Sequence, residues 1–237
     1  MKIAIMQPYF FPYIGYYQLI HAVDIFVIYD NIKYTKKGWI NRNRFILNGK
    51  EKLFTVPIKS ASNVLNINER YLSDDYEKKM KKTLFQIKNS YSKTVFFNEI
   101  YPILEKLFLY DQVDLKKNLF DYIRFSVFFI CELLGIDSQI IISSKLDIDH
   151  KLKFDRKIIA ICNELGASSY INPIGGKNIY NRENFTENKI SLKFLEMNKI
   201  IYQQFSKIFI PNLSIIDVLM FNGFKKTSAM LKEFKLI

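Results

Sequence analysis

Short apolar runs and one segment of helical spacing alternate through the first thirty residues. Residues 2–6 are mostly apolar and predict a first β-strand. Residues 15–23 repeat apolar side chains at the spacing of one helix face. Residues 25–29 form a continuous apolar run, which is typical of a buried parallel strand. The pattern therefore predicts an N-terminal βαβ unit.

A β-pattern returns on both sides of Asn48-Gly49. Residues 45–47 and 52–58 flank this dipeptide, which supplies the positive φ angles of a tight turn, so we expect a β-hairpin. Further short apolar runs predict extended segments at residues 139–142, 169–171, 190–194 and 199–202.

Helical spacing dominates residues 74–137, within which we expect helices over 98–109 and 114–134. Two later helices are predicted over residues 155–165 and 214–221, the second ending at Asn222-Gly223. Asp217 follows Ser214 at the spacing of a capping box. We interpret Asp217 as a helix cap, with a place in the functional site as the alternative.

The alternation of strands and helices predicts an α/β fold. We expect a Rossmann-like parallel sheet that begins with the βαβ unit and carries a helical insertion or lid. A chain of 237 residues suits one domain, residues 1–237, with a helical subdomain at about residues 73–137.

Composition narrows the class of protein. The apolar fraction of 49% is enough for a buried core and excludes a disordered chain. No apolar run reaches the roughly 18 residues of a membrane span, and the first run stops at Gln7-Pro8, too early for a signal peptide. Two Cys and two His provide neither a disulfide framework nor metal-ligand spacing. We therefore expect a cytoplasmic protein with no metal site.

Positive charge is concentrated in two segments. The formal net charge is +12. Residues 33–52 hold seven Lys and Arg against one Glu, and residues 77–93 hold six Lys against one Glu. The second segment is typical of the solvated face of an amphipathic helix. The first mixes an aromatic ring with donors that suit phosphate or carboxylate, Asn43 among them. This mixture predicts a binding role for the segment, with Trp39, Asn41, Arg42 and Arg44 as its candidate binding residues.

The segment from Gln7 to Tyr17 is the densest motif in the chain. It places two prolines and several aromatic residues directly after the first predicted strand. In open α/β sheets, ligands bind outside the carboxyl ends of strands, and Gly15 allows an anion to approach the start of the next helix. We interpret the loop as a binding element, with an aromatic cap over the sheet edge as the alternative. Its candidate binding residues are Gln7, Tyr9, Tyr13 and Gly15.

Two further motifs suit the same crevice. Asp30 ends a predicted strand and is the strongest candidate for a catalytic carboxylate; nearby cations such as Lys37 favour its ionised form. Gly175-Gly176-Lys177 follows another strand and resembles a very short phosphate loop, although the full phosphate-loop spacing is absent. We expect all three of these residues to bind substrate, with Lys177 meeting an anion.

Several blocks of the chain together resemble the WbqC-like family. They are residues 7–17, 22–27, 39–43, 53–58, 134–136, 170–172 with 175–177, 202–204 and 213–217. Members of that family occur in bacterial O-antigen and other surface-polysaccharide clusters, and a glycine-transferase role has been suggested for them. One departure is Asn172-Pro173, where we expect Ser-Gly, so a hydroxyl is missing there.

The resemblance implies a transferase that passes an aminoacyl group, glycyl in the suggested case, to the amine of a nucleotide-linked amino sugar. The cationic loop of residues 33–44 would then hold the diphosphate, and Asp30 would be the base or the amine anchor. Tyr9, Tyr16 and Trp39 would stack on sugar or nucleobase. The predicted catalytic set is Asp30, Tyr16 and Lys37. Aminoacyl-tRNA is one candidate donor, since basic charge suits phosphate contacts, and the sequence identifies no cofactor.

Two alternatives remain. A basic chain with aromatic residues also suits a non-catalytic nucleic-acid-binding or scaffold protein, although no nucleic-acid-binding signature is present. The order strand, Pro-aromatic loop, Tyr13-Ile14-Gly15-Tyr16 and helix is similar to nucleotidyltransferases with a His-x-Gly-His signature. Both histidine positions are Tyr here, and a Tyr hydroxyl carries no positive charge at neutral pH.

Overall fold

The first strand of the chain lies inside a six-stranded sheet. The computed structural model describes residues 1–109, 117–205 and 208–237, and its sheet has the strand order β5-β2-β1-β6-β7-β8. Neighbouring strands pair in parallel, except that β8 is antiparallel to β7. The fold is Rossmann-like α/β, as predicted. The strands are β1 (Lys2–Met6), β2 (Ile25–Ile28), β5 (Gln139–Ile142), β6 (Ser169–Pro173), β7 (Ser191–Met197) and β8 (Phe234–Leu236).

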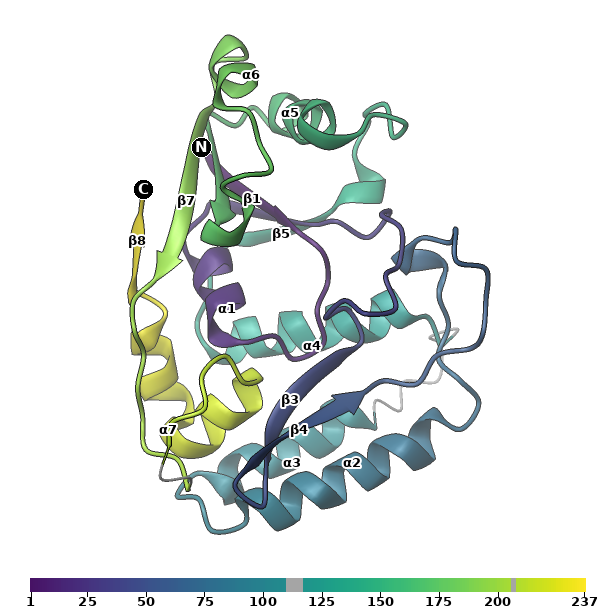
Figure 1. The fold of residues 1–237 in the computed structure, drawn as a ribbon, viewed down its shortest axis with the longest axis vertical. Helices are drawn as coiled ribbons and strands as arrows, with labels where there is room; N and C mark the ends of the chain where they lie inside the picture. The colour runs from purple at the N-terminus through teal and green to yellow at the C-terminus, as the bar shows by residue number, and fades with distance from the viewer. Residues whose placement is uncertain (110–116, 206–207) are drawn as a thin grey trace.

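Helices cover both faces of this sheet (Figure 1). Successive side chains of a strand point to opposite faces, so Ile3 and Ile5 of β1 enter one core while Ala4 enters the other. The smaller core contains side chains of α5 (Phe154–Glu164) and α6 (Arg182–Glu187). The larger core contains side chains of α1 (Ile14–His21), α4 (Leu119–Leu133) and α7 (Ile215–Met230). The predicted β1-α1-β2 unit is confirmed, because β1 and β2 pair in parallel from Ile3 and Ile25 onward.

The predicted hairpin is also confirmed. Strands β3 (Arg42–Leu47) and β4 (Lys50–Thr55) pair antiparallel, and the turn residues Asn48 and Gly49 have φ angles of 52° and 72°. Two more helices, α2 (Tyr76–Tyr91) and α3 (Phe97–Phe108), lie beside the hairpin and share the larger core (Figure 1).

Helices α2, α3 and α4 occupy the described part of the stretch that the sequence predicts to be helical. The predicted helix start at residue 114 lies outside the described residues, and α4 begins at Leu119 behind Asn118, whose Oδ1 accepts the N–H of Phe120 at 2.8 Å. Within the described parts of the chain, no helix combines the length and apolar character that a bilayer span requires.

The C-terminal helix is longer than predicted. Gly223 breaks it with a φ of 65°, as the predicted cap requires, but the chain then resumes helical geometry and continues to Met230. The break fits a close approach, because a Cβ on Gly223 would lie 2.6 Å from the ring of Phe96. Residues 199–202, predicted to be extended, join no strand of the sheet.

Asp217 is not a helix cap. Ser214 caps α7 through its own hydroxyl, which accepts the N–H of Ile216 at 3.3 Å. The buried carboxylate of Asp217 instead accepts hydrogen bonds from Tyr91 Oη (2.7 Å), Tyr202 Oη (2.6 Å) and Gln204 Nε2 (2.9 Å). This carboxylate joins α2, α7 and the segment after β7.

Candidate ligand-binding site

The sheet has a topological switch point beside its first strand. From β1 the chain proceeds outward to β2 and β5, and it then returns to the opposite side of β1 with β6. The loops that leave the carboxyl ends of β1 and β6 therefore diverge and leave a crevice, which is where ligands bind in open α/β sheets.

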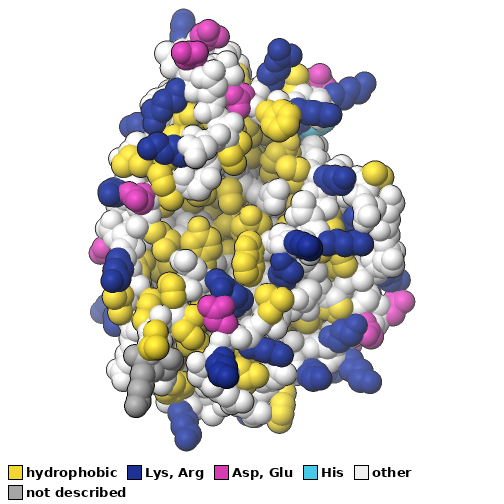
Figure 2. Space-filling model, viewed as in Figure 1, with side chains coloured by type: hydrophobic (Ala, Val, Ile, Leu, Met, Phe, Trp, Pro, Cys, Tyr) yellow, Lys and Arg dark blue, Asp and Glu magenta, His cyan; other side chains and the backbone are white. Residues whose placement is uncertain are grey.

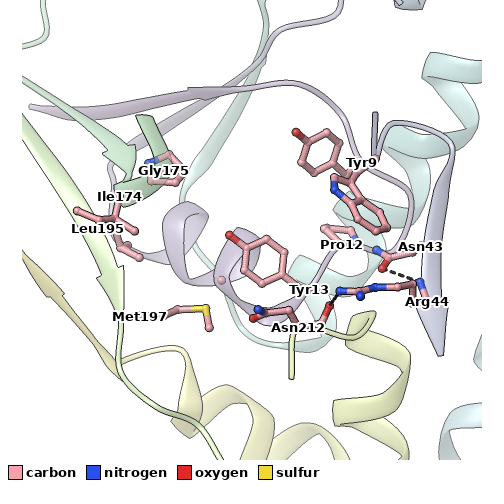
Figure 3. Close-up of a pocket in the computed structure, with 13 residues that line it drawn as sticks. Tyr9, Pro12, Tyr13, Asn43, Arg44, Ile174, Gly175, Leu195, Met197 and Asn212 are labelled. Carbon is pink, nitrogen blue, oxygen red and sulfur yellow. Dashed lines mark hydrogen bonds between the residues drawn. The ribbon is translucent and has the colours of Figure 1, made fainter. Parts of the chain in front are cut away.

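A cavity of about 450 Å³ lies at this crevice. Figure 3 shows Ile174, Leu195 and Met197 on one side of it and Tyr9, Asn43 and Arg44 on the other, with Tyr13 between them. The remaining lining residues are Pro12, Gly15, Trp39, Pro173, Gly175 and Asn212. Figure 2 shows hydrophobic side chains gathered in the hollow of this face, with Lys and Arg side chains around it. We call this space the switch-point cavity.

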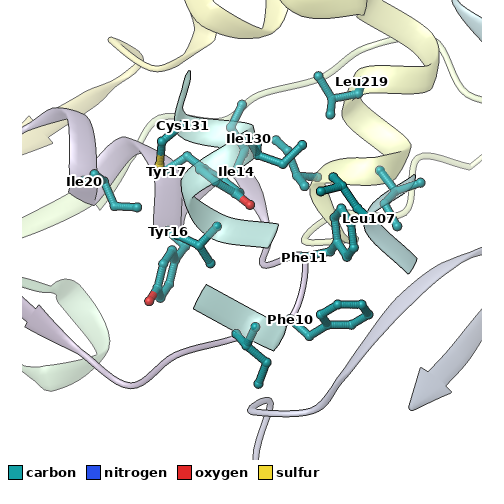
Figure 4. Close-up of a cluster of buried hydrophobic side chains, with 14 of the residues drawn as sticks. Phe10, Phe11, Ile14, Tyr16, Tyr17, Ile20, Leu107, Ile130, Cys131 and Leu219 are labelled. Atoms are coloured by element: carbon teal, nitrogen blue, oxygen red, sulfur yellow. The ribbon is translucent and has the colours of Figure 1, made fainter. Parts of the chain in front are cut away.

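The Pro-aromatic loop divides its aromatic rings between the core and the cavity. Phe10 and Phe11 are fully buried in the larger core (Figure 4), whereas Tyr9 and Tyr13 line the cavity. The two phenylalanines therefore pack into the core, whereas Tyr9 and Tyr13 stand where the binding interpretation requires them, and their binding role stays a prediction.

Hydrogen bonds from three elements hold this loop in place. Asn43 Nδ2 and Ser214 Oγ each donate to the Phe11 carbonyl at 2.7 Å. The Phe10 N–H donates to the Ile40 carbonyl at 2.9 Å. Phe11 has a φ of 42°, which turns its side chain into the core. The loop is preorganised, so a ligand would meet Tyr9 and Tyr13 already in position.

Trp39 forms one rim of the cavity and contacts two guanidinium groups. The Cζ atoms of Arg42 and Arg44 lie 5.7 and 5.1 Å from its ring centroid, within the range of cation–π attraction. Arg42 fixes the backbone just before Trp39. Its Nε donates to the Gly38 carbonyl at 2.8 Å, and one of its terminal guanidinium nitrogens donates to the Lys37 carbonyl.

Arg44 brings a cation to the cavity wall. Its guanidinium pairs with Glu51 at 2.7 Å and donates to the Asn212 carbonyl at 3.3 Å. The Arg44–Glu51 ion pair is partly exposed and therefore contributes little free energy. An anionic ligand that replaced Glu51 at Arg44 would lose only this weak pair.

The tyrosine hydroxyls of the cavity stay protonated at neutral pH. Burial raises the pKa of Tyr13, and burial together with the neighbouring Tyr13 raises the pKa of Tyr9. Each hydroxyl can therefore donate a hydrogen bond to a phosphate or to a developing oxyanion.

Gly15 is required where α1 approaches β7. A Cβ at this position would lie 2.4 Å from both Met197 Sδ and Tyr13 Cε2. We expect Gly15→Ala to displace both cavity-lining side chains and to lower the free energy of unfolding by about 1–3 kcal/mol, as overpacking does. Urea denaturation measures this. Gly175→Ala is the matched control, since a Cβ there meets no atom within 4 Å; equal losses in both variants would contradict the steric argument.

Comparison with known proteins places the chain in a family. The profile of the WbqC-like protein family matches residues 7–229. The chain belongs to the WbqC-like family. It is also similar to the Mycobacterium tuberculosis protein "Uncharacterized protein Rv1507c", with 29% identity over 222 residues and 92% of each chain covered. No solved structure matches it.

Six residues predicted as binding residues meet around the cavity of this WbqC-like protein. They are Tyr9, Tyr13, Gly15, Trp39, Arg44 and Gly175. They come from three separate segments of the chain, and the switch point is what brings them together.

The predicted catalytic residues lie elsewhere in this WbqC-like fold. Asp30 is buried and accepts hydrogen bonds from Asn68 Nδ2 (2.8 Å) and the Ser144 N–H (2.9 Å). Tyr16 is buried in the larger core, and its hydroxyl donates to the Gln7 carbonyl at 2.9 Å. Lys37 is exposed, two residues before Trp39. None of these three is among the described residues that line the cavity.

Other predicted binding residues support the walls of the cavity. Asn41 is buried, where it accepts from Tyr34 Oη and donates to the Val56 carbonyl. A Cβ on Gly176 would lie 1.8 Å from Asn172 Nδ2, so Gly176 packs against β6, and Lys177 is exposed directly after it.

Three lining residues that the sequence did not indicate come from β7 and the segment after it. Leu195, Met197 and Asn212 carry no recognisable motif. Asn43 is not among the candidate binding residues either, although it belongs both to the donor-rich segment beside Trp39 and to the block of residues 39–43 that resembles the family. Among the described residues, no group of three or more His, Cys, Asp or Glu side chains could hold a metal ion.

Proposed function

We propose that this WbqC-like protein transfers an acyl group to the amine of a nucleotide-linked amino sugar in surface-polysaccharide biosynthesis. The switch-point cavity is the proposed acceptor site. The observation that carries the proposal is the lining of this cavity, which combines aromatic rings with one guanidinium and contains no carboxylate among its described residues. The aminoacyl, or glycyl, form of the acyl group is the one that the family resemblance implies.

Each part of the acceptor has a chemically suitable partner there. Tyr9, Tyr13 and Trp39 offer ring faces to a sugar or a nucleobase, and Arg44 offers a charged donor to the diphosphate. Lys177 is exposed two residues after the lining residue Gly175 and is the proposed second cation for the diphosphate.

The same lining favours amine nucleophilicity. A partly apolar cavity with a nearby guanidinium disfavours a bound ammonium, so the pKa of an amino group held there falls. The neutral amine then attacks the acyl carbon of an activated ester or thioester. An N–C bond forms, the bond from the acyl carbon to the donor oxygen or sulfur breaks, and the proton lost by the amine passes to the leaving group. Tyr13 or Tyr9 would donate a hydrogen bond to the oxyanion.

Binding can be followed with the intrinsic fluorescence of Trp39, the single tryptophan of the chain. Titration with uridine and thymidine diphosphate-linked amino sugars is expected to give a saturable change. Arg44→Ala should weaken binding about 10- to 100-fold, the size expected for loss of a charge-assisted contact of about 1.5–3 kcal/mol.

Glu51→Ala is the matched control, because it removes the same ion pair by deleting the carboxylate and leaves the Arg44 guanidinium in place without an anionic partner. We expect its affinity to equal or exceed that of the wild type. No response to any amino sugar, together with salt-sensitive binding of bulk RNA, would replace the proposal with the nucleic-acid-binding alternative. Pyrophosphate release from ATP would instead support the adenylating alternative.

A further inference from the structure

A second cavity adjoins the switch-point cavity. Its volume is about 510 Å³, and the two cavities share Met197 and Asn212 as lining residues. It lies between the start of α1, the segment after β7 and the first turn of α7, to which Ile14, Ile200 and Val218 belong. We call this space the β7 cavity.

Polar contacts fix the segment that forms its wall. Tyr202 and Gln204 both donate to the buried carboxylate of Asp217. Gln204 also holds Ile210 from both sides, since its Oε1 accepts the Ile210 N–H at 2.9 Å and its Nε2 donates to the Ile210 carbonyl at 3.1 Å. At the boundary with the switch-point cavity, Asn212 accepts from Arg44. The cavity is therefore part of a hydrogen-bonded framework.

The lining of the β7 cavity is mostly apolar. Side chains such as Ile200, Phe209, Leu213 and Val218 surround it, and Lys199 is the one charged residue among the described lining residues. Lys199 is an exposed residue, so its charge stays solvated at this edge of the cavity. Neither cavity has an Asp or Glu among those residues.

This charge distribution discriminates between acyl groups. An aminoacyl group carries an α-ammonium, which would find no carboxylate among the described lining residues and would be repelled by the Lys199 and Arg44 cations. An unsubstituted hydrocarbon chain gains free energy from transfer out of water. A cation at the rim also suits the phosphate of an acyl carrier rather than an ammonium.

We propose that the β7 cavity binds the hydrocarbon chain of an activated acyl donor, so that the transferred group is an apolar acyl group and not glycyl. This inference rests on the proposed function, whose acceptor site it leaves unchanged. The donor's acyl carbon would lie where the cavities meet, at Met197 and Asn212. The amine of the sugar bonds to that carbon, the carrier thiolate leaves with the amine's proton, and the products are an amide and a free thiol.

Ile201→Glu tests the donor site directly. Ile201 lines the β7 cavity and is 59% exposed, so a carboxylate there charges the cavity without burying a new group in the core. Ile179→Glu is the matched control, because Ile179 is 63% exposed and lines neither of the two cavities. Decanoyl-coenzyme A and glycyl-tRNA are the donor probes, and binding is measured by calorimetry.

We expect saturable binding of decanoyl-coenzyme A that weakens about tenfold or more in Ile201→Glu, a change of roughly 1.4 kcal/mol, and stays within about twofold in Ile179→Glu. Amino-sugar binding, followed by Trp39 fluorescence, should be unchanged in both variants. Binding of the glycyl donor without the decanoyl donor, or equal losses in the two variants, would overturn the inference while leaving the acceptor site intact. Decanoyl binding without any amino-sugar binding would instead overturn the acceptor site of the proposed function and leave the hydrocarbon site in the β7 cavity standing.

Discussion

Replacing Asp217 with alanine is expected to lower the free energy of unfolding by about 3–4 kcal/mol. The substitution leaves Tyr91, Tyr202 and Gln204 without their shared acceptor, and each buried donor that loses its partner costs about 1–3 kcal/mol, only partly recovered by relaxation. Urea denaturation measures the loss. Asp121→Ala is the control, since Asp121 is on the surface of α4 with an Arg124 partner at 3.4 Å, and its loss should stay within about 0.5 kcal/mol.

The pH dependence of the same site has a defined sign. Burial raises the pKa of Asp217 above its ordinary 3.8, although its three partners act in the opposite direction. The folded chain therefore holds this proton more tightly than the unfolded chain does. The contribution of the protonated Asp217 to the free energy of unfolding is therefore greatest below pH 3.8. It declines as the pH rises through the raised pKa of the folded chain. The free energy of unfolding of the wild type should fall relative to that of Asp217→Asn as the pH rises through this range. A difference between the two proteins that does not change with pH would contradict a raised pKa at Asp217.

Phe10→Ala is the second large effect that we expect, with a loss of about 3–5 kcal/mol in the free energy of unfolding, typical of a buried phenylalanine. Phe10 is fully buried, and its ring contacts Phe11, Phe108 and Tyr122 at centroid distances of 4.7, 5.4 and 5.1 Å. Urea denaturation again gives the measurement, and Phe10→Leu serves where the alanine variant does not fold.

Tyr9→Ala provides the matched comparison, because the neighbouring ring lines the cavity instead of filling the core. It should cost less than half as much stability and should weaken amino-sugar binding. Equal stability losses at the two positions would show that the loop does not divide its rings between the core and the cavity as the structure indicates.

Local sequence patterns predicted the strands and turns near the cavity, because residues adjacent in the sequence determine where such elements begin and end. Strand β1 begins and ends where the apolar run does, and the hairpin turn follows from Asn48-Gly49, whose backbone adopts the required positive φ. The sequence likewise indicated a helix end at Gly223, since a glycine adopts a φ of 65° without strain. What no local pattern conveys is that the helix resumes afterwards, since that depends on packing against the larger core.

Asp30 and Asp217 show where sequence reasoning about the site stopped. A strand-end carboxylate can act in catalysis or support loops, and no local pattern reveals that Asn68 and the Ser144 N–H, 38 and 114 residues away, reach Asp30. The catalytic role of Asp30 stays a prediction, whereas the capping interpretation of Asp217 was wrong. Its partner Tyr91 is 126 residues distant, and spacing within one helix contains no information about such a contact.

Apolar periodicity and turn residues were thus sufficient for the Rossmann-like fold class, for the βαβ unit and for the loop on which Tyr9, Tyr13 and Gly15 stand. The sheet order decided which of the candidates share a cavity, because it places β6 beside β1 and so brings Gly175 to the loop after β1. Packing decided the rest. Phe10 and Phe11 entered the core, Tyr9 and Tyr13 did not, and β7 supplied a wall that no motif marks, since alternation along a chain cannot reveal which distant side chains close a cavity.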